Sequence, residues 1–164
     1  MMRKTIAAGV ILFAVGAFFL FGGSRSQAPS GDAFTVTLAV SAETLLENMH
    51  LLSEYRHRLV PDDGIIFPPT EVFAHDGESV FDVLNREMRN AGIHMVFRQM
   101  PVFGSVYIEG INNIFEFDAG GLSGWKYQVN GDFPGVGASA FILQEGDFIE
   151  WLFTVDLGRD LGYE

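Results

Sequence analysis

Residues 124–151, "GWKYQVNGDFPGVGASAFILQEGDFIEW", contain two strand patterns separated by a long glycine-rich segment. In residues 125–129, aromatic or aliphatic side chains alternate with polar ones, which is the period of a half-buried strand. Asn130 and Gly131 follow, a dipeptide that tolerates the positive φ values of a tight turn. The same alternation returns in residues 148–154. We therefore predict two strands here, each with its large apolar side chains on one face.

The rest of the chain adds further strands and one amphipathic helix. Residues 34–40 alternate apolar with small or polar side chains, which predicts the first strand. Residues 79–92 predict a helix that is capped by Ser79 with Asp82 three residues on and that stops at Gly92. The apolar stripe of this helix, which we expect to pack in the core, consists of Val80, Phe81, Leu84, Met88 and Ala91.

Shorter signals occupy the remaining segments. Residues 41–64 predict short helical turns and loop, because proline and glycine interrupt any regular element. Residues 70–75, 94–100 and 105–111 are typical of strands, and residues 112–117 predict a further short piece. Together these signals predict the α+β class, with a mostly β sheet packed on one helix.

The N-terminus carries an apolar run. Residues 5–23 are uncharged and follow Arg3 and Lys4, and the length of the run approaches the roughly 20 residues of a bilayer-spanning helix. The run is either a retained hydrophobic anchor helix, which its length favours, or a signal peptide cleaved near the small residues that follow it. Either fate places the remainder outside the cytoplasm, anchored or secreted. The predicted parts are the signal peptide or membrane anchor, residues 1–26, a linker, residues 27–33, and one domain, residues 34–164.

Composition excludes several classes of function. The chain has no cysteine, so a disulfide framework, a cysteine zinc site and a thiol nucleophile are all excluded. All 21 acidic residues but only seven of the ten basic ones follow residue 26, which leaves that part with a net charge of −14. Because a surface of this sign repels phosphate backbones, we predict no nucleic-acid partner.

The sequence contains no recognisable constellation for catalysis or metal binding. The four histidines form no HExxH or HxH pair, and no serine lies in a GxSxG turn. Asp156 and Asp160 only loosely match a calcium loop, since the spacing differs and the final glutamate is missing, so a solvated tail is the simpler interpretation. The basic cluster at residues 56–58 is expected to pair with nearby acids, namely Glu54, Asp62 or Asp63. We predict a protein that is not an enzyme, with no metal site and no required cofactor.

The quoted stretch holds more aromatic side chains than one small sheet face must bury. Loop residues 133–139 lie beside them and could leave a face open for a flat, partly apolar molecule. The alternative is a fully buried core with tight turns, which is the more natural interpretation for the two tryptophans, Trp125 and Trp151. The candidate ligand-binding residues are Trp125, Tyr127, Asn130, Phe133, Pro134, Val136, Gly137 and Ser139.

Residues 122–162, "LSGWKYQVNGDFPGVGASAFILQEGDFIEWLFTVDLGRDLG", closely resemble a bacterial family of exported domains of unknown function. That family is related to the C-terminal domain of transcobalamin and intrinsic factor and to the β-grasp domains that bind soluble ligands. The resemblance implies a β-grasp-like mixed sheet on one main helix. It also implies that some members carry cysteines where this chain has Ala42, Ala119, Ala138 and Val155. The framework or ligand-side positions that it implies are Trp125, Gly131, Pro134, Gly137, Phe141 and Ile149.

Two functional hypotheses follow. The first is an exported, non-catalytic module that binds a small soluble ligand, with cobalamin or a related corrinoid as a candidate, and that serves an uptake transporter or another surface protein. The second is a structural or protein-interaction domain of the cell surface, in which the same aromatic residues form the core and a sheet edge meets a partner protein.

Overall fold

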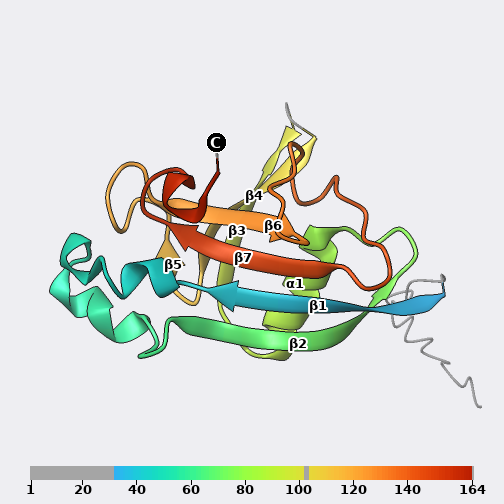
Figure 1. Ribbon diagram of the computed structural model, residues 1–164, viewed down its shortest axis with the longest axis horizontal. Coiled ribbons are helices and arrows are strands. Elements are labelled where there is room, and N and C mark those ends of the chain that lie inside the picture. The colour runs from blue at the N-terminus through green and yellow to red at the C-terminus, as the bar shows by residue number, and fades with distance from the viewer. Residues whose placement is uncertain (1–31, 102–103, 164) are drawn as a thin grey trace, which may run out of the picture.

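A computed structural model of the protein describes residues 32–101 and 104–163 (Figure 1). The predicted N-terminal hydrophobic helix and nearly all of the linker lie outside these residues. Within them, no helix is long and apolar enough to cross a membrane.

The main sheet has four strands in the order β2-β1-β7-β6. Strand β1 (Ala33–Ser41) lies antiparallel to β2 (Ile65–His75) and parallel to β7 (Phe148–Thr154), and β7 pairs antiparallel with β6 (Gly124–Val129). The sheet is therefore mixed, as the family resemblance implied. Both strands predicted from the quoted stretch are confirmed, and they are hydrogen-bonded neighbours.

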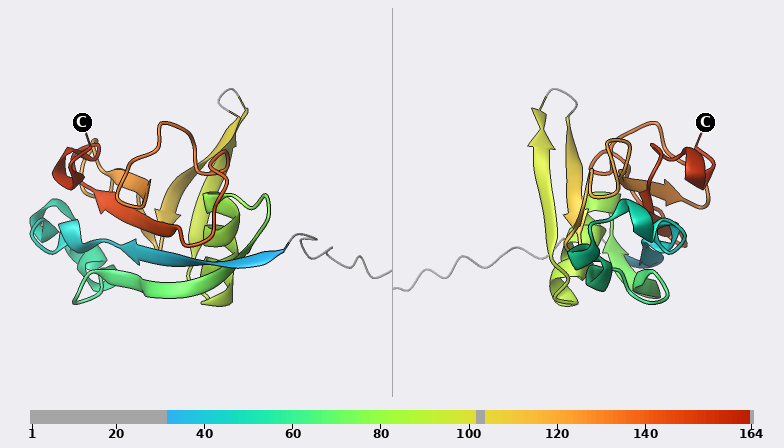
Figure 2. Two further views of the ribbon diagram at one scale, coloured as in Figure 1. Left: turned by 45° about the vertical axis from the view of Figure 1, so that its right-hand side comes forward. Right: turned by 90° about the vertical axis from the view of Figure 1, so that its left-hand side faces the viewer.

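A second sheet holds β3 (Met95–Met100), β4 (Ser105–Ile111) and β5 (Ile114–Phe115). The expectation of one sheet was wrong in this respect, although all three strands lie where the sequence placed them. Asn112 and Asn113 adopt positive φ values of 52° and 60°, so the chain turns back at once and pairs β5 with β4. Figure 2 shows the β3–β4 hairpin standing apart from the main sheet.

Helix α1 (Val80–Asn90) carries the predicted cap and packs into the core. The Ser79 and Asp82 side chains each accept a hydrogen bond from the other's backbone N–H, which forms a capping box. The predicted stripe is buried except for Ala91, which is exposed, and Val83 is buried in addition. Phe81 meets Phe97 of β3 edge to face, with ring centroids 4.8 Å apart, so α1 links the two sheets.

Strand β2 is longer than predicted because it continues through Pro68 and Pro69. Both prolines are exposed and lie at a register shift in the β1–β2 pairing. Proline is tolerated there because β2 is an edge strand and a bulge needs no ladder hydrogen bond at that point.

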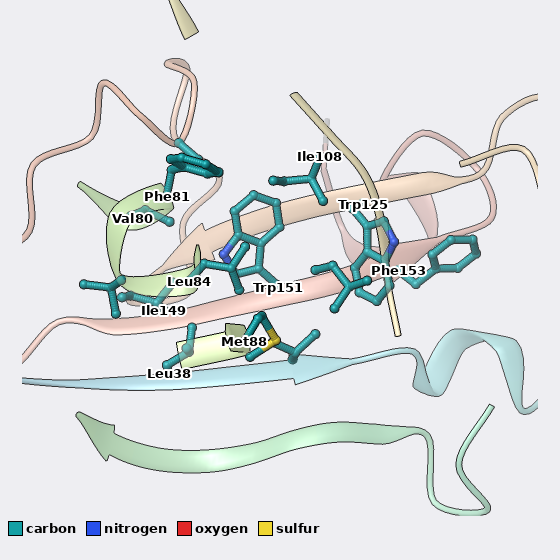
Figure 3. Packing of buried hydrophobic residues seen from close by; sticks show 14 of the residues in the cluster. Leu38, Val80, Phe81, Leu84, Met88, Ile108, Trp125, Ile149, Trp151 and Phe153 are labelled. Atoms are coloured by element: carbon teal, nitrogen blue, oxygen red, sulfur yellow. The ribbon is translucent and has the colours of Figure 1, made fainter. Parts of the chain in front are cut away.

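The predicted helical turns are three 3₁₀ helices: η1 (Glu43–Leu45), η2 (Met49–Leu51) and η3 (Glu54–Leu59). A further 3₁₀ helix, η5 (Arg159–Leu161), lies near the C-terminus. Among the described residues, the buried apolar cluster runs from Val36 to Phe153 in sequence (Figure 3).

Candidate ligand-binding cleft

Strands β6 and β7 direct their aromatic side chains to the same face. The strand register pairs Trp125 with Phe153 and Tyr127 with Trp151, and the ring centroids of these pairs lie 5.3 and 5.4 Å apart. Trp125 is only 8% exposed, and its indole N–H donates to the Ile114 carbonyl oxygen at 2.9 Å. Trp151 is 3% exposed and lies in the middle of the apolar cluster (Figure 3). Both tryptophans are therefore core residues.

A cleft opens where β4 and β6 meet the loop that follows the Asn130–Gly131 turn. Its volume is about 190 Å³. It contains six of the eight predicted ligand-binding residues: Trp125, Tyr127, Phe133, Pro134, Val136 and Gly137. We call this the aromatic cleft, and its other lining residues are Val106, Tyr107, Ile108, Lys126, Ala138, Trp151 and Tyr163.

The loop wall of the aromatic cleft is fixed by specific contacts. The Tyr127 hydroxyl donates to the Val136 carbonyl oxygen at 2.7 Å, and burial raises the pKa of Tyr127 to about 12. A methyl group at Gly137 would lie 1.7 Å from Oγ of Ser105, so only glycine allows the loop to approach β4 this closely. The Val136 side chain itself is 52% exposed and points out of the core. The loop therefore presents apolar surface from a constrained backbone.

The structure does not bring the other two predicted residues into the aromatic cleft. Asn130 adopts φ 56° in the turn, where its side chain donates to Asp147 and accepts from the Phe148 backbone N–H, each at 2.9 Å. Ser139 accepts a hydrogen bond from the Val106 backbone N–H at 3.1 Å and so ties the loop to β4. Both side chains hold the walls of the cleft in place.

The sequence did not reveal the wall that β4 contributes or the part that Tyr163 plays. Phe133 and Tyr163 meet edge to face at 5.4 Å, and the Lys126 ammonium lies 4.0 Å from the centre of the Tyr163 ring. The C-terminal segment is thus folded against the domain, although Asp160 itself remains exposed to solvent, as expected from the sequence. The cause is local, because Asp160 accepts hydrogen bonds from the Thr154 hydroxyl and, at 2.8 Å, from the Val155 backbone N–H.

Charged groups near the cleft are mostly paired. The Tyr107 hydroxyl donates to Glu116, and burial together with that carboxylate raises the pKa of Tyr107 to about 12. Arg98 lies 4.9 Å from the centre of the Tyr107 ring and pairs with Glu109 at 2.9 Å.

Elsewhere, Arg56 pairs with Asp118 and not with the neighbouring acids expected from the sequence, because η3 turns its side chain toward the segment after β5.

Apart from the indole N–H groups, the polar side-chain groups of the aromatic cleft are three phenol hydroxyls and the Lys126 ammonium. Burial raises the pKa of the Tyr107 and Tyr127 phenols to about 12, so both are neutral at pH 7, where they donate to Glu116 and to the Val136 carbonyl oxygen. Among residues 32–101 and 104–163, no three histidine, aspartate or glutamate side chains are grouped so as to hold a metal ion.

Comparisons with known proteins agree with this fold. Residues 77–154 match the family model described as Domain of unknown function (DUF4430), which confirms over these residues the family resemblance stated from the sequence. The matched segment begins just before α1 and ends with β7, so it contains most of the aromatic cleft. No curated protein matches the chain.

Among solved structures, the chain resembles haptocorrin in complex with Cbi. The TM-score is 0.54, the identity is 14%, and the match covers 78% of this chain and 26% of the haptocorrin chain. At this identity the likeness establishes the fold, which is transcobalamin-like as expected. A metal-binding-protein candidate from Ruminococcus gnavus ATCC 29149 matches with a TM-score of 0.44 and 12% identity, over 74% of this chain and 96% of that one.

Proposed function

We propose that the domain is an exported, non-catalytic module that binds a small ligand in the aromatic cleft, and that a corrinoid such as cobalamin is the first candidate. The observation that supports this most directly is the open, rigid loop wall beside a buried aromatic floor. Loops held on a rigid scaffold commonly carry binding residues, and concave aromatic surfaces suit flat apolar molecules. The fold shared with haptocorrin, a protein seen in complex with Cbi, supports the choice of ligand.

The size of the cleft limits how the ligand is held. Sites for drug-sized molecules measure about 300–1,000 Å³, whereas the aromatic cleft measures about 190 Å³. We therefore propose that it holds one edge or side group of a corrinoid, with the rest of the molecule outside. Affinity then depends on a few contacts at the loop, chiefly those of Phe133, Pro134 and Val136.

The competing function is protein interaction through a sheet edge. Phe73 on β2 favours it, since this side chain is 70% exposed. The prolines of β2 weaken it, because Pro68 and Pro69 have no N–H groups to pair with an added strand. The small-ligand hypothesis accounts for more of the molecule.

We further propose that residues 1–26 direct the domain out of the cytoplasm and either anchor it in the membrane or are removed. In the anchored form the domain would deliver ligand to an uptake transporter. Cell fractionation combined with the intact mass of the purified protein separates the alternatives. Recovery of the full-length protein from the cytoplasm would contradict export.

Calorimetric titration tests ligand binding. Because the described residues form a complete sheet and a buried apolar cluster among themselves, the chain without residues 1–26 is the material, provided that its thermal unfolding is cooperative. We expect cyanocobalamin or dicyanocobinamide to bind, and a concentration of 100 times the Kd to raise Tm by about 8 °C. Phe133→Ala and Val136→Ala are expected to weaken binding about tenfold.

The matched control is Phe73→Ala, which removes an exposed phenylalanine ring from β2, away from the aromatic cleft. It is expected to bind the corrinoid as the wild type does. If millimolar corrinoid produces neither heat nor a shift in Tm, the corrinoid hypothesis is wrong. Equal loss of binding in all three variants would place the ligand elsewhere.

A further inference from the structure

A second cleft adjoins the aromatic cleft on the other side of Lys126. Its volume is about 250 Å³, and it shares Tyr107, Trp125 and Lys126 with the aromatic cleft. The remaining walls come from the loop between β5 and β6 and from the segment after β7. We call it the second cleft, and its own lining residues are Phe117, Gly121, Leu122, Ser123, Gly124, Thr154 and Leu157.

The second cleft displays apolar side chains from an unusual backbone. Phe117, Leu122 and Leu157 are 61%, 45% and 49% exposed. Phe117 and Leu157 also adopt φ values of 66° and 56°, a region that bulky residues rarely occupy. Each is held there by a backbone hydrogen bond into the same loop, from Phe117 to Ser123 at 3.2 Å and from Leu157 to Leu122 at 2.8 Å. Strained positions that keep apolar groups in water are often found at binding sites.

Lys126 lies at the junction of the two clefts. Its ammonium is 4.0 Å from the centre of the Tyr163 ring, and a methyl group at Gly158 would come within 3.4 Å of its Cε atom. The Lys126 side chain is therefore packed against Tyr163 and Gly158. Among the described residues, no carboxylate forms an ion pair with it. The carboxylate of Glu116 accepts the Tyr107 hydroxyl nearby, and Glu164 lies outside the described residues.

The charge of these two clefts is opposite to that of the domain. Within the described residues, neither lining includes an aspartate or a glutamate, and Lys126 is the one charged residue in both. Three other surface clefts all contain carboxylates: Glu43, Glu47 and Asp160 in one, Glu71 and Glu87 in another, and Asp32, Asp76 and Glu145 in the third. The nearest carboxylates, Glu116 and Asp160, lie behind the lining and accept hydrogen bonds from Tyr107 and Thr154, so Lys126 is the charged group that a ligand in either cleft would meet first.

We propose that the aromatic cleft and the second cleft form one two-part site for an amphipathic anion, with the anionic group on Lys126 and apolar groups on either side. This proposal rests on the proposed function and specifies the chemical class of its ligand. The anion is a carboxylate or a phosphate attached to a flat apolar framework. An anion at Lys126 gains a charge-assisted contact that a neutral ligand of the same shape lacks.

Two fluorescent probes that differ in one charge test the proposal on the chain without residues 1–26. Anilinonaphthalene sulfonate is an amphipathic anion, and N-phenylnaphthylamine is its neutral counterpart. We expect the wild type to bind the anion about tenfold more tightly than the neutral probe. Lys126→Met is expected to abolish this preference, because it weakens binding of the anion about tenfold more than binding of the neutral probe. Lys126→Arg retains the charge and is expected to retain the preference.

The role of the second cleft is tested with Phe117→Asn. Asparagine tolerates positive φ, so this variant is expected to melt at the same temperature as the wild type or higher. It is nevertheless expected to bind both probes several-fold more weakly, a combination that a purely structural role for Phe117 would not produce. Phe73→Ser removes an exposed phenylalanine elsewhere and is expected to leave both affinities unchanged.

The outcomes separate this proposal from the proposed function. If both probes bind equally well to the wild type and to Lys126→Met, small-ligand binding stands and the anion site is wrong. If neither probe binds, the two-part anion site is wrong, and the corrinoid titration alone decides the proposed function. Displacement of the sulfonate by naphthoate or by naphthyl phosphate supports the proposal, and the tighter competitor identifies the anionic group. Binding to phosphatidylglycerol vesicles that requires Lys126, without binding of either probe, would overturn it in favour of a membrane surface.

Discussion

The strand pair β6–β7 and the loop at residues 133–139 use the same kinds of side chain in opposite ways. Phe153 on β7 is 1% exposed and packs against Trp125, whereas Val136 in the loop is 52% exposed. Strand alternation sends every second side chain into the core. A loop has no such alternation. Here the loop backbone is fixed by the hydrogen bond from the Tyr127 hydroxyl and by the close approach of Gly137 to β4. The position of an apolar residue in the backbone, more than its type, decides whether it stabilises the fold or faces a ligand.

The largest expected effect comes from removing a ring on the strand side. Phe153→Ala is expected to lower the free energy of unfolding by about 4 kcal/mol, because it leaves a cavity in the core. Phe133→Ala removes the same ring from the loop side and is expected to cost about 1 kcal/mol, the value of its contact with Tyr163. Urea unfolding measures both. Equal losses would mean that the loop ring is also part of the core.

The next effect concerns how the loop is held. Gly137→Ala is expected to cost about 1–3 kcal/mol, since its new methyl group would overlap Ser105. Ser105→Gly removes that side chain, so the double variant is expected to recover most of the loss. A double-mutant cycle in urea gives the coupling between the two positions. Additive losses would show that the loop does not contact β4 there.

The turn between the two regions is expected to have a smaller effect. Asn130→Ala places a β-carbon in a left-handed conformation and removes two side-chain hydrogen bonds, at an expected cost of about 1–2 kcal/mol. Asn130→Gly relieves the conformational part only and is expected to cost less. If Asn130→Ala instead weakens ligand binding at unchanged stability, then Asn130 contacts the ligand directly.

Under ordinary conditions the least visible effect is the response to alkaline pH, because it appears only above pH 10. Burial raises the pKa of Tyr107 and Tyr127 from 10.0 to about 12, so their neutral forms are favoured in the folded state. This contribution to stability is fully present below pH 10 and is lost as pH rises toward 12. Absorbance titration of the four tyrosines is expected to show two that ionise late. Tyr127→Phe removes one of them, and a titration unchanged by this variant would contradict the assignment.

The elements of the fold were predictable where local rules govern them. The Ser79 and Asp82 capping box, the Asn130–Gly131 turn and the alternation in β6 and β7 each depend on residues close in sequence. The separation into two sheets was missed because it depends on which strands pair, and alternation alone does not specify partners.

The candidate site was predictable on the loop side only. Tyr163 packs on Phe133, and Val106 of β4 lines the same cleft as Tyr127, although these residues are distant in sequence and no spacing relates them. The alternation in residues 125–129 predicts that Lys126 lies on the polar face of a strand, and Lys126 does lie in strand β6. Its position between two clefts depends on the fold of the C-terminal segment, which was expected to be solvated.

An NMR titration of the chain without residues 1–26 with cyanocobalamin compares the two regions most directly. We expect the backbone amide signals of Val136, Gly137, Lys126 and Tyr163 to shift progressively, while the indole N–H of Trp125 remains protected from exchange by its bond to Ile114. Shifts confined to β2 and α1, or none at millimolar ligand, would contradict a binding site at the loop.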